Sequence, residues 1–167
     1  ASTTEETYME VIRGKTAMLF EASTHSAAAL AGANEVQREA LRTFGDHLGI
    51  AFQLVDDLLD YKGDAAELGK NVGDDLAEGK PTLPLIYTMR EGTEEQAALV
   101  RRAIQKGGIE DLESIRAAVD AAGALDYTAQ LARDYAERAI ACLDVLPAGE
   151  YRDALIELSR FAVARTH

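Results

Sequence analysis

The chain has 167 residues, which is enough to bury a sizeable hydrophobic core, and we expect a single domain. The sequence contains 17 Lys and Arg and 29 Asp and Glu, which gives a formal net charge of −12. This charge argues against a surface that binds nucleic acid or an anionic membrane, because both need clustered basic residues. No stretch approaches the ~20 consecutive apolar residues of a membrane span. The single cysteine, Cys142, excludes an intramolecular disulfide, so we expect a reducing, cytoplasmic setting and an apolar packing role for its thiol.

Capping signals and apolar periodicity predict helices along the first third of the chain. Thr3 opens a capping-box pattern, and apolar residues then recur at helical spacing over a stretch longer than most globular helices. Gly14 lies inside this stretch, so we expect a kink or break close to it. Asn34 with Gln37 forms a second cap, which predicts a helix to about Tyr61.

The rest of the chain also follows helical patterns. Residues 62–80 hold several glycines among many charges, which predicts a long irregular segment of the kind that often carries function. No strand pair with turn chemistry is found in the sequence, so the fold class is predicted to be all-α. Helices are predicted from about Thr82, with Pro84 in the first turn, from Thr93 to about Lys106, and over residues 110–122, 124–144 and 148–165.

Three carboxylates share one face of the helix predicted to end near Tyr61. With 3.6 residues per turn and Asp56 taken as zero, Asp60 falls at about 40°, Gln53 at about 60° and Asp57 at about 100°. Gly49 adds bare backbone to this arc. We therefore expect the carboxylate arc to stay open while the opposite, apolar side is buried: Ala51, Phe52, Leu54, Val55, Leu58 and Leu59.

Two interpretations of these carboxylates compete. A run of charges on an amphipathic helix is usually a solvated stripe. However, like charges four residues apart destabilise a helix, and no Lys or Arg lies three or four residues from these Asp residues to compensate. Oxygen-only ligands suit Mg²⁺, which proteins hold with one or two carboxylates plus substrate phosphates. Two unit charges ~4 Å apart interact by about 4 kcal/mol at an effective dielectric of about 20, so carboxylates would repel a diphosphate unless a cation lay between them. The sequence therefore favours a Mg²⁺ site at Asp56, Asp57 and Asp60.

Lysines at two places could contact an anion bound through that cation. Lys15 and Thr16 follow Gly14 as in the end of a phosphate-binding P-loop, but the upstream glycine and the preceding strand of that motif are missing. A kinked helix that presents a lysine and a hydroxyl could still contact phosphate. Lys70 and Lys80 belong to the glycine-rich segment after the carboxylates, which could fold over a bound diphosphate. An EF-hand interpretation of the same acidic residues fails because the loop spacing is absent.

These motifs together resemble the trans-isoprenyl (polyprenyl) diphosphate synthase family. Residues 52–61, followed by the lysines and glycines of 69–84, look like the second aspartate-rich region of that family. Residues 8–21, with Gly14-Lys15-Thr16, resemble its upstream Lys-Thr element. The similarity runs through the final helix and is strongest to the bacterial octaprenyl diphosphate synthases, which make the ubiquinone side chain.

The resemblance implies an isoprenoid-synthase-type helical bundle, commonly a homodimer, with a deep cavity. In that family an allylic diphosphate is ionised with the help of Mg²⁺, and isopentenyl diphosphate then attacks the cation. Carried over by position, the metal ligands would be Asp56, Asp57 and Asp60, and the residues in contact with the diphosphate would be Lys15, Lys70 and Lys80. The catalytic set would be Lys15, Thr16 and Gln53, with the last two beside the allylic cation.

One departure from the family pattern is large. The family has two aspartate-rich motifs, and only the second is found here; the other Asp pair, at 74–75, lacks the spacing of the first. We therefore expect the chain to be the C-terminal part of a single synthase domain, paired with an N-terminal half and inactive alone. A non-catalytic subunit that stabilises a partner chain is the alternative, and a terpene cyclase with a similar metal cluster is a third, less favoured hypothesis.

Overall fold

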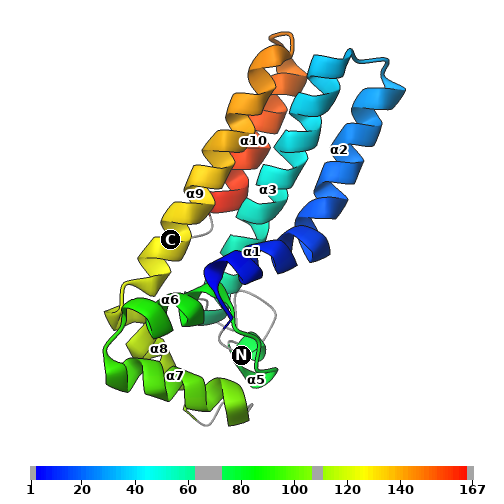
Figure 1. Ribbon diagram of the computed structural model, residues 1–167. Helices are drawn as coiled ribbons and strands as arrows, with labels where there is room; N and C mark the ends of the chain where they lie inside the picture. Colours follow the sequence, from blue (N-terminus) through cyan, green and yellow to red (C-terminus); the bar gives the residue numbers. More distant parts are fainter. Residues whose placement is uncertain (1–2, 63–72, 107–110, 165–167) are drawn as a thin grey trace. The chain divides into compact units, whose positions relative to one another are not determined.

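The computed structural model describes residues 3–62, 73–106 and 111–164, and in these residues every regular element is helical (Figure 1). The all-α prediction is confirmed. None of the described helices is both long and apolar enough to cross a membrane. The elements are α1 (Glu5–Ile12), the π-helical η1 (Arg13–Ala17), α2 (Met18–Leu30), α3 (Glu35–Lys62), α5 (Asp74–Ala77), α6 (Leu83–Glu91), α7 (Glu94–Lys106), α8 (Leu112–Ala121), α9 (Ala124–Cys142), the 3₁₀-helical η2 (Leu143–Val145) and α10 (Glu150–Ala164).

The chain forms two compact units, each made of segments that are distant in sequence. Unit 1 contains Ala1–Tyr8 and Asp56–Ala129, and unit 2 contains Met9–Val55 and Gln130–His167. The long helices α3 and α9 each contribute residues to both units. The expectation that these segments belong to one domain stays a prediction.

Unit 1 is built around α6, α7 and α8, which contact one another. Its core is aliphatic with one buried phenol, as the low aromatic content of the sequence requires, and α5 packs on α7 at its edge. The buried residues of this core are Leu58, Tyr61, Leu76, Leu85, Val100, Ala103, Ile115, Val119, Ala124, Leu125 and Ala129.

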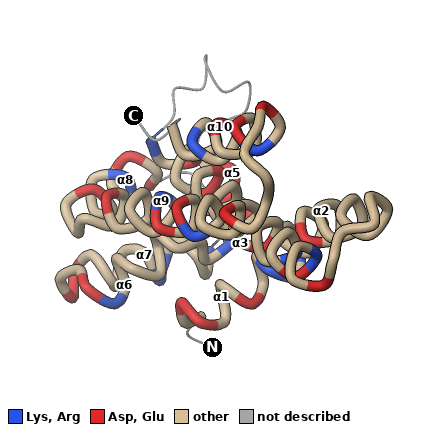
Figure 2. Tube along the Cα trace, turned by 90° about the horizontal axis from the view of Figure 1, so that it is seen from above, with Lys and Arg blue, Asp and Glu red and all other residues tan. Residues whose placement is uncertain are grey.

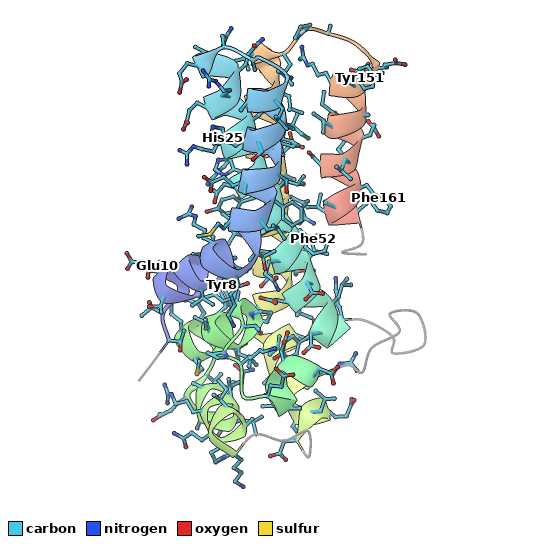
Figure 3. The ribbon with its side chains drawn as sticks, turned by 90° about the vertical axis from the view of Figure 1, so that its right-hand side faces the viewer. Tyr8, Glu10, His25, Phe52, Tyr151 and Phe161 are labelled. Carbon is cyan, nitrogen blue, oxygen red and sulfur yellow. The ribbon has the colours of Figure 1, made fainter. Side chains whose placement is uncertain are left out.

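Unit 2 packs α2, the first part of α3, the second part of α9, and α10 lengthwise (Figure 1). Its core contains Phe44 and Leu48 from α3 and Ala139 from α9. Cys142 is half-buried against this core, and burial raises the pKa of its thiol, which fits the predicted packing role. Acidic and basic residues are interspersed along α10 (Figure 2), and its Tyr151 and Phe161 are exposed (Figure 3).

The irregularity predicted near Gly14 is a π-helical segment. Five residues, Arg13–Ala17, form η1, and the chain changes direction there on its way into α2 (Figure 1). A Cβ added at Gly14 would meet nothing within 4 Å, so this glycine is not needed for close packing. Single π-helical turns inside α-helices are rare, and many of them lie at functional sites.

Side-chain caps form as predicted at the starts of α3 and α7. Asn34 and Gln37 exchange reciprocal hydrogen bonds of 2.9 and 3.2 Å at the start of α3. Thr93 and Gln96 do the same for α7, at 2.8 and 3.2 Å. The first cap was predicted one residue too early, because Thr4 and not Thr3 accepts the backbone N–H of residue 7.

Gly49 allows α3 to approach η1 closely. A Cβ built on this glycine would lie 2.6 Å from the Cα of Ala17, a backbone atom that cannot move aside without shifting the helix. The prediction that Gly49 presents open backbone next to the carboxylates was wrong, since Ala17 covers it. A helical wheel gives the direction in which Gly49 faces, but it does not tell which element packs against that face.

Gly49→Ala is expected to lower the free energy of unfolding by about 1–3 kcal/mol, the usual cost of inserting a methyl group into a closely packed contact. Urea denaturation followed by circular dichroism measures the change. Gly14→Ala is the matched control, and it should leave stability unchanged or raise it by up to about 1 kcal/mol, because alanine favours helix and the site is open. Equal stability of the two variants would contradict the packing role of Gly49.

Candidate functional site

The three predicted metal ligands lie near the C-terminal end of α3, in unit 1. Asp57 and Asp60 are 3% and 1% exposed, and Asp56 is half-buried. The prediction of an open carboxylate arc was therefore wrong for two of the three residues. On the face predicted to be core, Phe52 is 38% exposed. The carboxylates are thus not a solvated stripe, and their burial has to be offset by hydrogen bonds or counter-charges.

Tyr8 of α1 provides one such hydrogen bond. Its hydroxyl donates to Oδ2 of Asp57 at 2.5 Å across 49 positions of sequence, and its own side chain is buried. Burial, and next the negative charge of Asp57, raise the pKa of Tyr8 well above its usual value. The phenol therefore stays protonated and remains a donor. Sequence analysis missed Tyr8 as a site residue, because nothing in the local pattern indicates a contact across such a separation.

The backbone of the segment around α5 holds Asp60. The N–H of Asp75 donates to Oδ2 of Asp60 at 3.2 Å, and the N–H of Gly73 donates to the backbone carbonyl of Asp60 at 3.0 Å. Gly73 adopts φ +88°, and a Cβ there would lie 2.7 Å from Leu112, so both conformation and space favour glycine. The sequence analysis excluded the pair at 74–75 only as the first aspartate-rich motif, and the structure places Asp75 beside Asp60.

Lys80 is connected to this group through Asp75. Its Nζ lies 3.3 Å from Oδ1 of Asp75 and 2.5 Å from a carboxylate oxygen of Glu78. The hydrogen bond to Glu78 raises the pKa of Lys80, so it carries a full positive charge at neutral pH. The predicted diphosphate contact Lys80 is thus brought next to the acidic segment of α5. Lys70 lies outside the described residues.

In unit 2, two of the predicted catalytic residues meet. The hydroxyl of Thr16 in η1 donates to Oε1 of Gln53 in α3 at 2.8 Å. Lys15, the neighbour of Thr16, is exposed on η1. The π-helical segment therefore joins the Lys-Thr element to α3 through a side-chain bond as well as through the Gly49 contact described above.

The donor set suits a hard cation whose coordination is completed by another ligand. Within the described residues no three His, Cys, Asp or Glu side chains converge closely enough to hold a metal ion by themselves. Mg²⁺ is usually held by one or two carboxylates, with waters and substrate phosphates filling the remaining positions. A carboxylate offers about four acceptor positions, so the bond from Tyr8 is compatible with cation binding at Asp57. The residues present therefore fit Mg²⁺ shared with a phosphate ligand.

The fold, with its carboxylates at the end of a long helix, is that of the all-α isoprenoid synthases. Residues 1–122 match the Polyprenyl synthetase family, and the chain belongs to this family.

Several relatives support this assignment. The chain is 52% identical over 163 residues to an all-trans-nonaprenyl-diphosphate synthase (geranyl-diphosphate specific) of Rhodobacter capsulatus, covering 98% of this chain and 50% of the relative. It is also 52% identical over 163 residues to the octaprenyl diphosphate synthase of Escherichia coli, covering 97% and 50%. The chain thus spans about half the length of the curated relatives it matches.

Solved structures agree with the sequence comparison. A polyprenyl synthase of Caulobacter crescentus, in complex with calcium and isoprenyl diphosphate, superimposes with a TM-score of 0.92 at 44% identity, over 98% of this chain and 51% of that one. A decaprenyl diphosphate synthase of Rhodobacter capsulatus gives a TM-score of 0.91 at 43% identity, over 99% and 52%.

Thr16→Val is expected to lower the free energy of unfolding by about 0.5–1.5 kcal/mol, because it removes the donor to Gln53 while keeping the side-chain volume. Thr43→Val is the control at a half-buried position of α3, where the hydroxyl bonds to the carbonyl of Glu39 one turn earlier in the same helix. That control should change stability by less than about 0.5 kcal/mol. Urea denaturation of both variants checks the prediction, and a Thr16→Val protein as stable as the control would contradict it.

Proposed function

We propose that the chain is part of a Mg²⁺-dependent prenyltransferase that adds isopentenyl diphosphate to an allylic diphosphate and makes a long-chain trans-polyprenyl diphosphate. The observation that carries the proposal is the carboxylate group at Asp56, Asp57 and Asp60, of which the last two are buried, in a chain that is about half identical to such synthases along almost its whole length. The names of these relatives indicate products of eight and nine prenyl units. We propose an octaprenyl-like product for a quinone side chain, and a cytoplasmic enzyme.

Each predicted residue has a role in this proposal. Asp56, Asp57 and Asp60 would hold Mg²⁺, which when bound would neutralise the charge of the allylic diphosphate and assist its departure. Support for a divalent cation comes from the Caulobacter crescentus relative, which was solved with calcium and isoprenyl diphosphate. Lys15, Lys70 and Lys80 would contact the diphosphate oxygens, and Thr16 and Gln53 would line the place where the allylic cation forms. Fixed positive charge at the leaving group is the main way such residues lower a barrier.

The surface of unit 2 supports the proposal that this chain contacts another protein chain or segment. Several large apolar side chains are exposed on α2 and α10: Met18, Leu19, Leu30, Tyr151, Leu158 and Phe161. Apolar side chains that are solvent-exposed in one chain often mark a contact with another. We propose that they contact the remaining half of the synthase fold or a second copy in a homodimer. We also propose that these 167 residues alone are inactive, because they contain one of the two aspartate-rich motifs of the family.

The metal assignment is tested by titrating the chain with inorganic diphosphate in excess Mg²⁺ and measuring heat. Replacing both Asp56 and Asp57 by Asn should weaken diphosphate binding at least about tenfold, because the cation that bridges protein and phosphate loses its ligands. Asp126→Asn is the control for the loss of a negative charge, since Asp126 is exposed on α9 of the same unit. Binding that is equally tight in the double variant and the wild type would exclude these residues as ligands.

Catalysis is tested in a chimera that joins this chain to the N-terminal half of the Escherichia coli octaprenyl diphosphate synthase. Elongation of an allylic diphosphate by isopentenyl diphosphate is expected in Mg²⁺, with loss on adding EDTA. The double Asn variant should lower kcat by about 10²-fold or more, the usual cost of removing charge stabilisation at a leaving group. A folded chimera that binds diphosphate but never elongates would instead favour the non-catalytic subunit.

A further inference from the structure

The contact between Tyr8 and Asp57 joins the start of the chain to a predicted metal ligand. The two side chains are 5% and 3% exposed, and the 2.5 Å bond runs from the hydroxyl to a single oxygen, Oδ2. A hydrogen bond to one oxygen restricts rotation of the carboxylate about its Cβ–Cγ bond. Carboxylates that ligate metals are generally held in this manner by neighbouring donors, and these donors tune metal affinity.

The start of α1 is itself held by a second cluster of side chains. Glu5 accepts hydrogen bonds from Nη1 of Arg90 at 2.7 Å and from the hydroxyl of Tyr127 at 2.8 Å. The guanidinium of Arg90 lies over the rings of Tyr87 and Tyr127, 5.2 and 5.7 Å from their centroids, and the two rings stack 4.3 Å apart. These residues come from α1, α6 and α9, and all belong to unit 1.

Glu5 and Tyr8 are three residues apart on α1, which places them on one face of the helix, one turn apart. The Glu5 cluster therefore restricts the translation and rotation of the helix turn that carries Tyr8. The chain of contacts runs from Arg90 and Tyr127 to Glu5, along one turn of α1 to Tyr8, and from there to Asp57.

We propose that Tyr8 is a positioning residue that orients the Asp57 carboxylate toward a cation, and that the cluster of Glu5, Arg90 and Tyr127 fixes α1 for this purpose. The proposal rests on the function proposed above, in which Asp57 binds Mg²⁺ together with a diphosphate. Tyr8 suits the task because a phenol donates one hydrogen bond without adding a positive charge, so the carboxylate keeps its attraction for a cation.

Tyr8→Phe removes only the hydroxyl and is the direct test. The probe is inorganic diphosphate in excess Mg²⁺, titrated into the chain and followed by calorimetry. The dissociation constant should rise about tenfold, the lower end of the effect of removing a hydrogen-bond partner of a metal ligand. Tyr135→Phe is the matched control, because the Tyr135 ring, in unit 2, packs against His47 and Arg138 through its faces and edges, contacts that phenylalanine retains. Its dissociation constant should equal that of the wild type.

Tyr127→Phe tests the second step independently and guards against a Tyr8→Phe protein that does not fold. It removes one of the two bonds to Glu5 and leaves Asp57 and its donor untouched. The dissociation constant should rise roughly two- to threefold, since the bond acts on Asp57 only through α1. Urea denaturation in EDTA measures the stability of each variant without metal.

The outcomes separate this proposal from the proposed function. If the wild type binds diphosphate and Tyr8→Phe loses stability but keeps the wild-type dissociation constant, Tyr8 has a structural role only and the proposal is wrong. Tighter binding by Tyr8→Phe would show that the phenol competes with the cation, which also overturns it. If Tyr127→Phe binds as the wild type does, the Glu5 cluster has no part in positioning. A wild type that fails to bind diphosphate in Mg²⁺ would overturn the assignment of Asp56, Asp57 and Asp60 as a site for Mg²⁺ and diphosphate, and this proposal with it, whereas the prenyltransferase reaction is tested separately in the chimera.

Discussion

The burial of two carboxylates at the end of α3 is the constraint on which the surroundings of the site depend. Asp57 and Asp60 lie within the last two turns of a helix that ends at Lys62, where the helix dipole disfavours negative charge. Asp56 lies four residues before Asp60, so like charges also repel along the helix. Unfavourable terms of this kind survive where function requires them, and they have to be offset by neighbouring groups.

The neighbouring groups are supplied by three separate stretches of the chain. Tyr8 donates to Asp57, the N–H of Asp75 donates to Asp60, and Lys80 sits against Asp75. Each interaction constrains its own element: α1 must bring a phenol to α3, Gly73 must take a left-handed conformation, and α5 must begin beside Asp60. The short α5 helix and the glycine before it are therefore explained by the need to satisfy a buried carboxylate rather than by helix propensity.

Features set by local chemistry could be predicted from the sequence, and features set by distant partners could not. The reciprocal caps at Asn34 and Thr93 depend on residues three positions apart, so the pattern alone located the starts of α3 and α7. Thr3 and Thr4 have the same capping chemistry, and only the geometry of the first turn selects Thr4. The direction of the carboxylate face followed from helical periodicity. Its burial did not, because Tyr8 is 49 residues away and no periodic pattern encodes that contact.

The hydrogen bonds from Tyr8 to Asp57 and from Asp75 to Asp60 come from neutral donors, which has a consequence for cation binding. An arginine or lysine in the place of Tyr8 would also satisfy Asp57, but it would cancel the charge that attracts a divalent cation. The phenol and the backbone N–H of Asp75 orient two carboxylates without adding any formal positive charge. Lys80, in contrast, pairs with Asp75 and Glu78 on the adjoining segment. Lys80 therefore lies beside the segment that contacts Asp60, and the hydrogen bonds from Tyr8 and from the N–H of Asp75 themselves cancel none of the negative charge that would attract Mg²⁺ bound together with a diphosphate.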